Sequence, residues 1–322
     1  MTELAIRTEH LTKIYSQRLI AVNDMNLEVP KGSVFGLLGP NGAGKTTTLR
    51  LLLGLQRPTA GRAEVFGKLC GPNAVNVRSQ IGYLPTNPRL PGNLRPIEYL
   101  DLLGKLSRLP YQVRKPRISA LLRAVGLLSA TEQRIQTFST GMCTRLGLAA
   151  SLVADPPLLL WDEPTAGLDP TARRFTLDLI RELGKTKTVV VATHILGDID
   201  QICDHLGVMH EGRMIFTGSM QDMKKRLRRE GFSLELEGDT DSIRRLAQEV
   251  NNLEGIDAHL GAGQTLIVRI DNERGRSGAL AEVLKLIDAS NLSLQAIHSG
   301  QNATENAYLQ LLQEEEAHGF HR

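Results

Sequence analysis

From residue 4 to about residue 218, short apolar runs rich in β-branched residues alternate with longer segments whose apolar residues recur at helical spacing. Residues 33–38 are typical of a buried strand, and the leucines of residues 46–53 predict a helix directly after it. This alternation predicts an α/β domain over residues 1–220, built on a mostly parallel sheet. Further strands are expected at residues 158–161, 188–192 and 205–209, and helices at 170–183 and 195–203.

The pattern changes twice along the chain. Between residues 96 and 131 the strand signals disappear and leucine recurs at helical spacing, which predicts a helical subdomain inserted at about residues 92–155. Residues 221–231 are dense in charge, which is typical of a helix end or a linker. Beyond them, an accessory C-terminal α+β domain is predicted at residues 232–322. Its expected strands lie at 232–237, 264–270 and 292–297, and its expected helices at 240–250, 278–289 and 302–317.

Composition is that of an ordinary globular protein. The chain has 322 residues, 41% of them hydrophobic and 23% charged, and a net charge of only +3. Because acids and bases are interspersed, no nucleic-acid partner is expected. The longest apolar runs, such as residues 146–154, are far shorter than the roughly 20 residues that span a bilayer, and no export signal is visible. Any membrane role is therefore expected to need a partner. Cys70, Cys143 and Cys203 lack metal-ligand spacing and are expected to be buried small side chains.

A glycine-rich segment follows the first buried strand. Residues 39–46 match the phosphate-binding pattern G-x-x-x-x-G-K-[ST] between a strand and a helix. Gly42 and Gly44 let backbone N–H groups approach phosphate oxygens closely. Lys45 then supplies a positive charge to the phosphates, and Thr46 offers a hydroxyl to Mg²⁺. The alternative is a tight glycine turn that holds Lys-Thr by chance. The expected nucleotide-binding residues are Gly39, Pro40, Asn41, Gly42, Ala43, Gly44, Lys45, Thr46 and Thr47.

A second motif is an apolar run that ends in two adjacent acids, Leu-Leu-Leu-Trp-Asp-Glu at residues 158–163. Successive strand residues point in opposite directions, so Asp162 can face Mg²⁺ while Glu163 faces an attacking water. The alternative is that acids before Pro164 only begin a turn or cap a helix. Beside a phosphate-binding loop, this motif predicts the metal-binding and water-activating acids of a P-loop NTPase.

Shortly before that run lies the segment Phe-Ser-Thr-Gly-Met at residues 138–142. In this position it resembles the signature motif of the ATP-binding cassette (ABC) ATPases. Ser139 and Gly141 match the family's phosphate-contacting positions. The residues that depart from the family pattern are Phe138, Thr140 and Met142. From the residues alone, Ser-x-Gly before a helix is mostly just an N-cap, although a second helix N-terminus could face an anion.

Other positions agree with the family in order along residues 3–220. Residues 166–170 resemble the loop that lies along the family's dimer seam. His194, directly after a strand, matches the position that contacts the γ-phosphate, and Tyr15 matches the aromatic that stacks on adenine. The alternatives are a structural hydrogen bond for His194 and core packing for Tyr15. One position departs, because Thr86 stands where the family usually has Gln or Glu near Mg²⁺ and water.

The resemblance implies a P-loop NTPase cassette that binds ATP with Mg²⁺ and hydrolyses it. Two cassettes would pair head to tail, as a homodimer or with another cassette. Ser139 and Gly141 of one would then cover the ATP held by Lys45 of the other. The implied catalytic residues are Glu163 and His194, and the implied metal ligands are Thr46 and Asp162.

The single cassette with a trailing domain resembles the ATPase subunits of bacterial export-type transporters with separate membrane subunits. This implies a protein peripheral to the cytoplasmic face of the cell membrane, where it powers export through a transmembrane permease. One alternative is a soluble cassette ATPase outside transport, for example in cofactor assembly. A second is a nucleotide-sensing regulatory module, against which the intact Glu163 and His194 argue.

Overall fold

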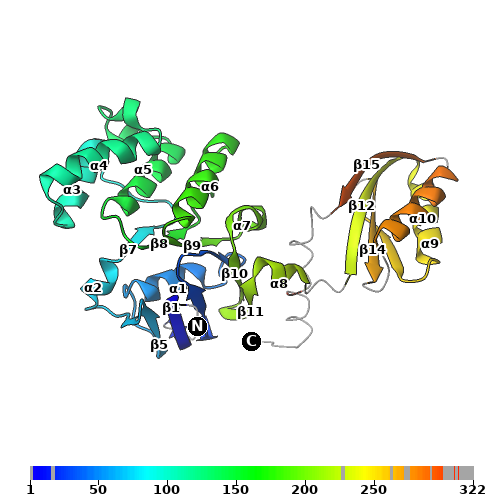
Figure 1. Cartoon of the computed structure of the whole chain (residues 1–322), viewed down its shortest axis with the longest axis horizontal. Helices are drawn as coiled ribbons and strands as arrows, with labels where there is room; N and C mark the ends of the chain where they lie inside the picture. The colour runs from blue at the N-terminus through cyan, green and yellow to red at the C-terminus, as the bar shows by residue number, and fades with distance from the viewer. Residues whose placement is uncertain are drawn as a thin grey trace. The chain divides into compact units, whose positions relative to one another are not determined.

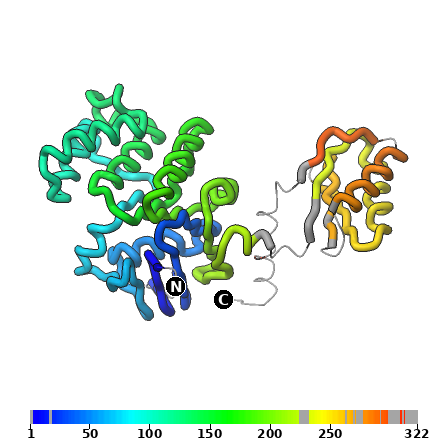
Figure 2. Tube along the Cα trace, in the orientation of Figure 1, coloured from blue at the N-terminus to red at the C-terminus, as the bar shows by residue number. Residues whose placement is uncertain are grey.

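The chain divides into two compact units, Met1–Met220 and Gln221–Arg322, and each is described by itself (Figure 1, Figure 2). The structure is a computed structural model, and it describes residues 3–15, 19–225, 229–261, 264–271, 276–290, 292–299, 308 and 311. The helix predicted at residues 302–317 lies outside the described residues, apart from helical positions at Tyr308 and Leu311.

A six-stranded sheet forms the centre of the first unit. In sheet order its strands are β11 (Arg213–Ser219), β10 (His205–His210), β4 (Val34–Leu38), β9 (Thr188–Thr193), β8 (Leu158–Asp162) and β7 (Ile81–Leu84). All neighbours pair in parallel except β10 and β11. Every residue of β4, β8 and β9 is buried. Continuous apolar runs fit this environment, because strands at the centre of a parallel sheet are covered on both faces.

A second, antiparallel sheet lies in the same unit. It consists of β1 (Leu4–Ile14), β2 (Ile20–Met25), β3 (Glu28–Pro30), β5 (Ala60–Val65) and β6 (Lys68–Leu69). Helix α1 (Lys45–Leu52) contacts strands of both sheets. Its Leu49 and Leu52 are fully buried in one cluster with Leu11 of β1 and Leu160 of β8. The two sheets therefore share a hydrophobic core around the helix that follows the phosphate loop.

Helices form a separate part of the first unit, where α3 (Pro96–Leu106), α4 (Tyr111–Ala124) and α5 (Thr140–Leu152) pack on one another (Figure 1). A partly buried ion pair joins the first two, because Arg114 Nε lies 2.5 Å from Asp101 Oδ1. The remaining helical elements of this unit are α2 (Val75–Arg78), η2 (Leu128–Ala130), η3 (Ile135–Thr137), α6 (Pro170–Gly184), α7 (Leu196–Ile202) and α8 (Met220–Lys225), the last of which continues into the second unit.

The second unit has the order strand, helix, strand, strand, helix, strand. Its elements are β12 (Arg229–Glu237), α9 (Thr240–Asn251), β13 (Ile256–Leu260), β14 (Thr265–Asp271), α10 (Arg276–Asp288) and β15 (Ser293–Ser299). The antiparallel sheet order β13-β14-β12-β15 is that of a ferredoxin-like fold. Alternate residues of β12, namely Phe232, Leu234 and Leu236, enter a core shared with α9 and α10. In the charge-dense segment at 221–231, residues 221–225 belong to α8 and residues 229–231 begin β12.

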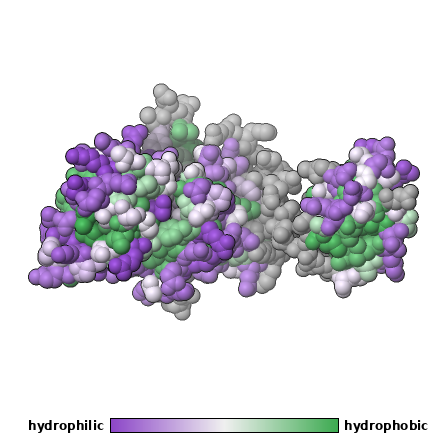
Figure 3. All heavy atoms as spheres, turned by 90° about the horizontal axis from the view of Figure 1, so that it is seen from above, coloured by the Kyte–Doolittle hydropathy of each residue, from purple (hydrophilic) through white to green (hydrophobic). Residues whose placement is uncertain are grey.

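None of the helices in the described part of the chain is both long and apolar enough to cross a bilayer. On the face drawn in Figure 3, hydrophilic and hydrophobic residues of the first unit are interspersed.

Candidate functional site

The phosphate loop, Asp162, Glu163 and His194 lie at one edge of the six-stranded sheet. The glycine-rich loop follows β4, Asp162 ends β8, and His194 directly follows β9. These three strands are parallel neighbours, so their carboxyl ends meet at the same edge. In open α/β sheets, this edge is where ligands bind.

The backbone conformation of the loop requires glycine at positions 42 and 44. Gly42 has φ of 85° and Gly44 has φ of 104°, a region that other residues rarely adopt. A Cβ at Gly44 would also collide with the carbonyl oxygen of Ala21. Helix α1 begins at Lys45, directly after this turn, so its N-terminal N–H groups point into the loop. The loop therefore has the shape of an anion cradle.

Lys45 reaches back across the loop with a side chain that is only 6% exposed. Its Nζ donates hydrogen bonds to the carbonyl oxygens of Gly39, at 2.7 Å, and Pro40, at 3.2 Å. The same atom lies 3.4 Å from Glu163 Oε1. The positive charge is thus held between the loop and the acid at the end of β8.

Asp162 is the most buried acid of the site, at 1% exposure. Thr46 Oγ1 donates a 2.7 Å hydrogen bond to Asp162 Oδ2, and Thr86 Oγ1 lies 3.4 Å from the Asp162 carbonyl oxygen. Burial raises the pKa of the Asp162 carboxyl above its ordinary value, while the bond from Thr46 opposes that shift. Among the described residues, Asp162 Oδ1 is buried without a hydrogen-bond partner. A buried, unpartnered carboxylate oxygen next to a hydroxyl fits a hard cation such as Mg²⁺.

Glu163 and His194 are in direct contact. The backbone of Glu163 has φ of 52°, and its N–H donates to the carbonyl oxygen of Ala192 at 2.8 Å. His194 Nδ1 lies 2.9 Å from Glu163 Oε2, and Thr193 Oγ1 donates to the same oxygen at 3.3 Å. The Glu163 side chain is 10% exposed and the His194 side chain 44%. An acid held by a lysine, a threonine and a histidine therefore faces the partly open side of the site.

Tyr15 follows β1, and its side chain lies beside Thr47, at the end of the predicted nucleotide-binding segment. It is not part of the buried core. Its hydroxyl donates to Gln56 Oε1 at 2.6 Å and lies 3.4 Å from Thr47 Oγ1. Lys13 Nζ lies 5.3 Å from the centre of its ring. The structure thus brings the aromatic ring next to the phosphate loop, although these residues are far apart in sequence.

Ser139 and Gly141 lie elsewhere in the first unit. Ser139 is the N-cap of α5, and its Oγ accepts a 3.3 Å hydrogen bond from the Met142 N–H. A Cβ on Gly141 would be 3.8 Å from Leu168, so the start of α5 faces the loop before α6. None of the hydrogen bonds found among the described residues joins Ser139 to the phosphate loop. The surroundings of these two residues are therefore the cap of α5 and the loop before α6.

Two contact residues were not among the sequence-predicted site residues. Thr193 bonds Glu163, and its place between a strand and His194 was a local signal for it. Gln56 bonds Tyr15 across 41 positions of sequence, and no local pattern marks it.

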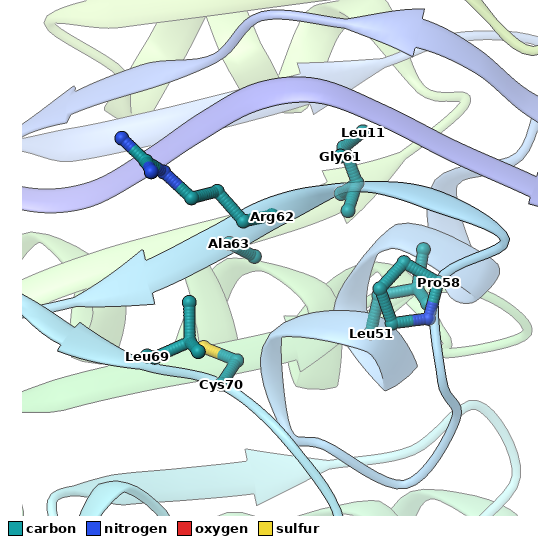
Figure 4. A pocket seen from close by; sticks show the side chains of 8 residues that line it. All are labelled: Leu11, Leu51, Pro58, Gly61, Arg62, Ala63, Leu69 and Cys70. Carbon is teal, nitrogen blue, oxygen red and sulfur yellow. The ribbon is translucent and has the colours of Figure 1, made fainter.

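A small pocket between β5, β6 and α1 is lined by none of the predicted site residues (Figure 4). Its lining includes Leu51, Pro58, Leu69 and Cys70. The predicted site residues and this pocket are therefore distinct parts of the first unit.

Comparisons with known proteins agree with this geometry. The family described as ABC transporter matches residues 22–166. The bacitracin transport ATP-binding protein BcrA of Bacillus licheniformis is 33% identical over 309 residues, covering 95% of this chain and 97% of that protein. The daunorubicin/doxorubicin resistance ATP-binding protein DrrA of Streptomyces peucetius is 35% identical over 312 residues, covering 95% and 92%. A solved structure of the ATP-binding subunit of an ABC transporter has a TM-score of 0.64 at 29% identity, covering 69% of this chain and 92% of that chain.

The fold and the site define a P-loop ATPase of the cassette type, which binds and hydrolyses ATP. The chain belongs to the ABC transporter family, in which it is an ATP-binding subunit. Relatives that match over nearly its whole length are ATP-binding proteins of transport and resistance systems. This supports the transporter-subunit hypothesis over a cassette ATPase outside transport and over a module that only senses nucleotide.

Proposed function

We propose that this subunit powers export through a separate transmembrane permease, from the cytoplasmic face of the membrane. The proposal is supported by the names of its relatives, which describe transport of bacitracin and resistance to daunorubicin and doxorubicin. In both, the ATP-binding protein is named as a component of its own. The helical insertion at about residues 96–131 is the proposed docking surface, and its exposed Leu102, Leu106 and Tyr111 offer apolar area to a partner.

Within the subunit, residues 39–47 hold the phosphates of ATP and Tyr15 stacks on its base. Lys45 exchanges its contacts with the loop carbonyl oxygens for the phosphate oxygens, which are stronger acceptors. Thr46 and Asp162 hold Mg²⁺, which neutralises charge on the phosphate oxygens when it is bound. Glu163 accepts a proton from the attacking water, and His194 orients the Glu163 carboxylate.

Two copies of the subunit form the complete site. Ser139 is the N-cap of α5 and Gly141 lies in its first turn, and this N-cap geometry suits an anion. In the proposed head-to-tail pair they close over the ATP held by Lys45 of the other copy. Hydrolysis cleaves the bond to the γ-phosphate, and release of inorganic phosphate then removes negative charge from the seam, so the pair opens. ATP binds the closed pair more tightly than the open one, so it shifts that equilibrium and moves the permease.

The observation that carries the proposed hydrolysis mechanism is the contact chain from Lys45 through Glu163 to His194. We predict that Glu163→Gln lowers steady-state phosphate release by about 100-fold or more, because an amide of the same size cannot accept the proton. ATP affinity, measured by calorimetry, should stay within about twofold of wild type, since Lys45 and Thr46 are intact. An ATP-dependent dimer should become easier to detect by light scattering.

Glu182→Gln is the matched control, because Glu182 is exposed on α6 and pairs only across the surface with Lys185. It should leave phosphate release unchanged. Near wild-type release by Glu163→Gln would refute the assigned role.

A further inference from the structure

A second buried acid lies behind the site, on α7. Asp198 is 1% exposed, and its two carboxylate oxygens bond to different elements. Oδ1 accepts a hydrogen bond from Arg173 Nε at 2.8 Å, and Arg173 Nη2 lies 2.7 Å from the same oxygen in an ion pair. Oδ2 accepts from Thr165 Oγ1. The carboxylate therefore joins α7 to α6 through one oxygen and to the loop before α6 through the other.

The loop that Asp198 holds begins at Glu163. Thr165, two residues later, is 3% exposed, and its carbonyl oxygen accepts the N–H of Leu168 at 3.3 Å. The N–H of Ala166 donates in turn to the Glu163 carbonyl oxygen at 3.2 Å. Backbone hydrogen bonds thus fix the loop on both sides of Thr165, and the Glu163 carbonyl oxygen accepts one of them.

Asp198 is also close in sequence to His194, the residue that contacts the Glu163 carboxylate. His194 lies four residues before Asp198, at the entry to α7, where the Ile195 N–H donates to Thr193 Oγ1 at 3.0 Å. The His194 ring contacts the Glu163 carboxylate. Asp198 consequently bonds to the loop after Glu163 and belongs to the helix after His194.

Packing alone does not call for an acid at this position. The other buried side chains on α7 include Ile199 and Ile202, both apolar. Burying a carboxylate is unfavourable unless both oxygens are bonded, and here each oxygen has a donor in a fixed direction. Unlike an apolar side chain, the Asp198 carboxylate makes directed hydrogen bonds that fix the positions of Thr165 and Arg173.

We propose that Asp198 is a positioning residue for ATP hydrolysis. It fixes the loop after Glu163 against α7, and so holds the Glu163 carboxylate and the His194 ring in contact without touching nucleotide. This inference rests on the roles proposed above for Glu163 and His194. Misplacement of a catalytic group by about 1 Å is enough to lower a rate by about 100-fold.

The test is Asp198→Ala, which removes both acceptors without adding bulk and leaves the Arg173 guanidinium, already partly exposed, free to turn to water. We expect kcat for ATP hydrolysis to fall about 10- to 100-fold while ATP affinity stays within about twofold. Thr165→Val removes only the hydroxyl and keeps the side-chain shape, and should show the same split between kcat and affinity. Asp178→Ala, at an exposed ion pair on α6, is the control and should change neither.

A folded Asp198→Ala protein with kcat within about twofold of wild type would overturn the inference. So would a loss of kcat and ATP affinity in proportion to a fall in Tm, since that is what a merely structural residue gives. If Asp198→Ala does not fold, Thr165→Val decides by the same criterion. The Glu163→Gln variant separates the two proposals. If it abolishes turnover while Asp198→Ala and Thr165→Val do not lower kcat, only the positioning role fails.

Discussion

Glu163 has an unusual backbone for an acid at the end of a strand. Its φ of 52° lies in the left-handed region, which costs a non-glycine residue roughly 1 kcal/mol or more. The backbone bond to Ala192 and the side-chain contacts of Lys45 and His194 hold it there. Strain of this kind persists where the surroundings fix it, and it turns the carboxylate out of the sheet toward the phosphate loop.

Cys70 offers a prediction about a single residue outside the site. Burial, with a smaller effect from the nearby Glu64 charge, raises the pKa of its thiol from 9.0 to about 12. Only the thiolate reacts with thiol reagents, so at pH 8 Cys70 should be labelled by a maleimide at least about 100-fold more slowly than an exposed cysteine. Burial also raises the thiol pKa of Cys143 and Cys203.

The measurement is a labelling time course read by mass spectrometry after digestion. In guanidinium chloride all three cysteines should react quickly, which is the control. Fast labelling of Cys70 in the folded protein would contradict the prediction.

Residues next to each other in sequence gave most of the site. The segments containing Lys45, Asp162 and His194 each follow a buried strand, so the meeting of these side chains at one edge could be expected from the parallel sheet alone. Partners such as Gln56 for Tyr15 could not, because a hydrogen bond between positions 41 residues apart leaves no local pattern. The same holds for the link from Asp198 to Thr165.

At the scale of helices and strands, the contact between α3 and α4 can be tested through Asp101. Hydrogen bonds from Lys105 and then Arg114 hold the pKa of this carboxyl below its ordinary value of 3.8. Asp101→Asn should therefore lower the free energy of unfolding of the folded protein by about 1–2 kcal/mol at pH 7, because the buried Arg114 loses its charged partner.

The pH dependence follows from the sign of the shift. A lowered pKa stabilises the fold above the pKa of the unfolded chain, and this contribution is lost as pH falls through the lowered value. The difference between wild type and Asp101→Asn in urea unfolding should hence shrink as pH falls below about 4. Asp178→Asn, at an exposed pair, serves as the control. A difference that stays constant down to low pH would contradict the prediction.

The central strands were predicted well because their signal is local. Uninterrupted apolar runs identify β4, β8 and β9 whatever they pair with. The antiparallel sheet of β1, β2, β3, β5 and β6 was not predicted as a separate sheet, because strand pairing depends on residues distant in sequence. For the same reason β12 begins at Arg229 instead of residue 232. Its first residues pair with the end of β14 at Asp271, and nothing in their own sequence shows it.

At the scale of the whole molecule, each unit has a core of its own. The cluster around Leu234, Val268 and Val283 lies entirely within residues 232–292, and the cluster around α1 lies entirely within the first unit. We predict that residues 221–322, expressed alone, unfold cooperatively on heating, with the circular dichroism of a mixed α/β protein. Residues 1–220 should keep ATP affinity within about twofold of the full chain. A non-cooperative melt of the shorter piece would show that its core is insufficient.

Two cores that share no side chain also have an evolutionary consequence. A genetic exchange after residue 220 would leave the residues of the cluster around α1 unchanged, because that cluster holds no residue of the second unit. Selection could then change whatever the second unit contributes while the ATP-hydrolysing half stays the same. The same ATP-hydrolysing unit could in this way be combined with different second units.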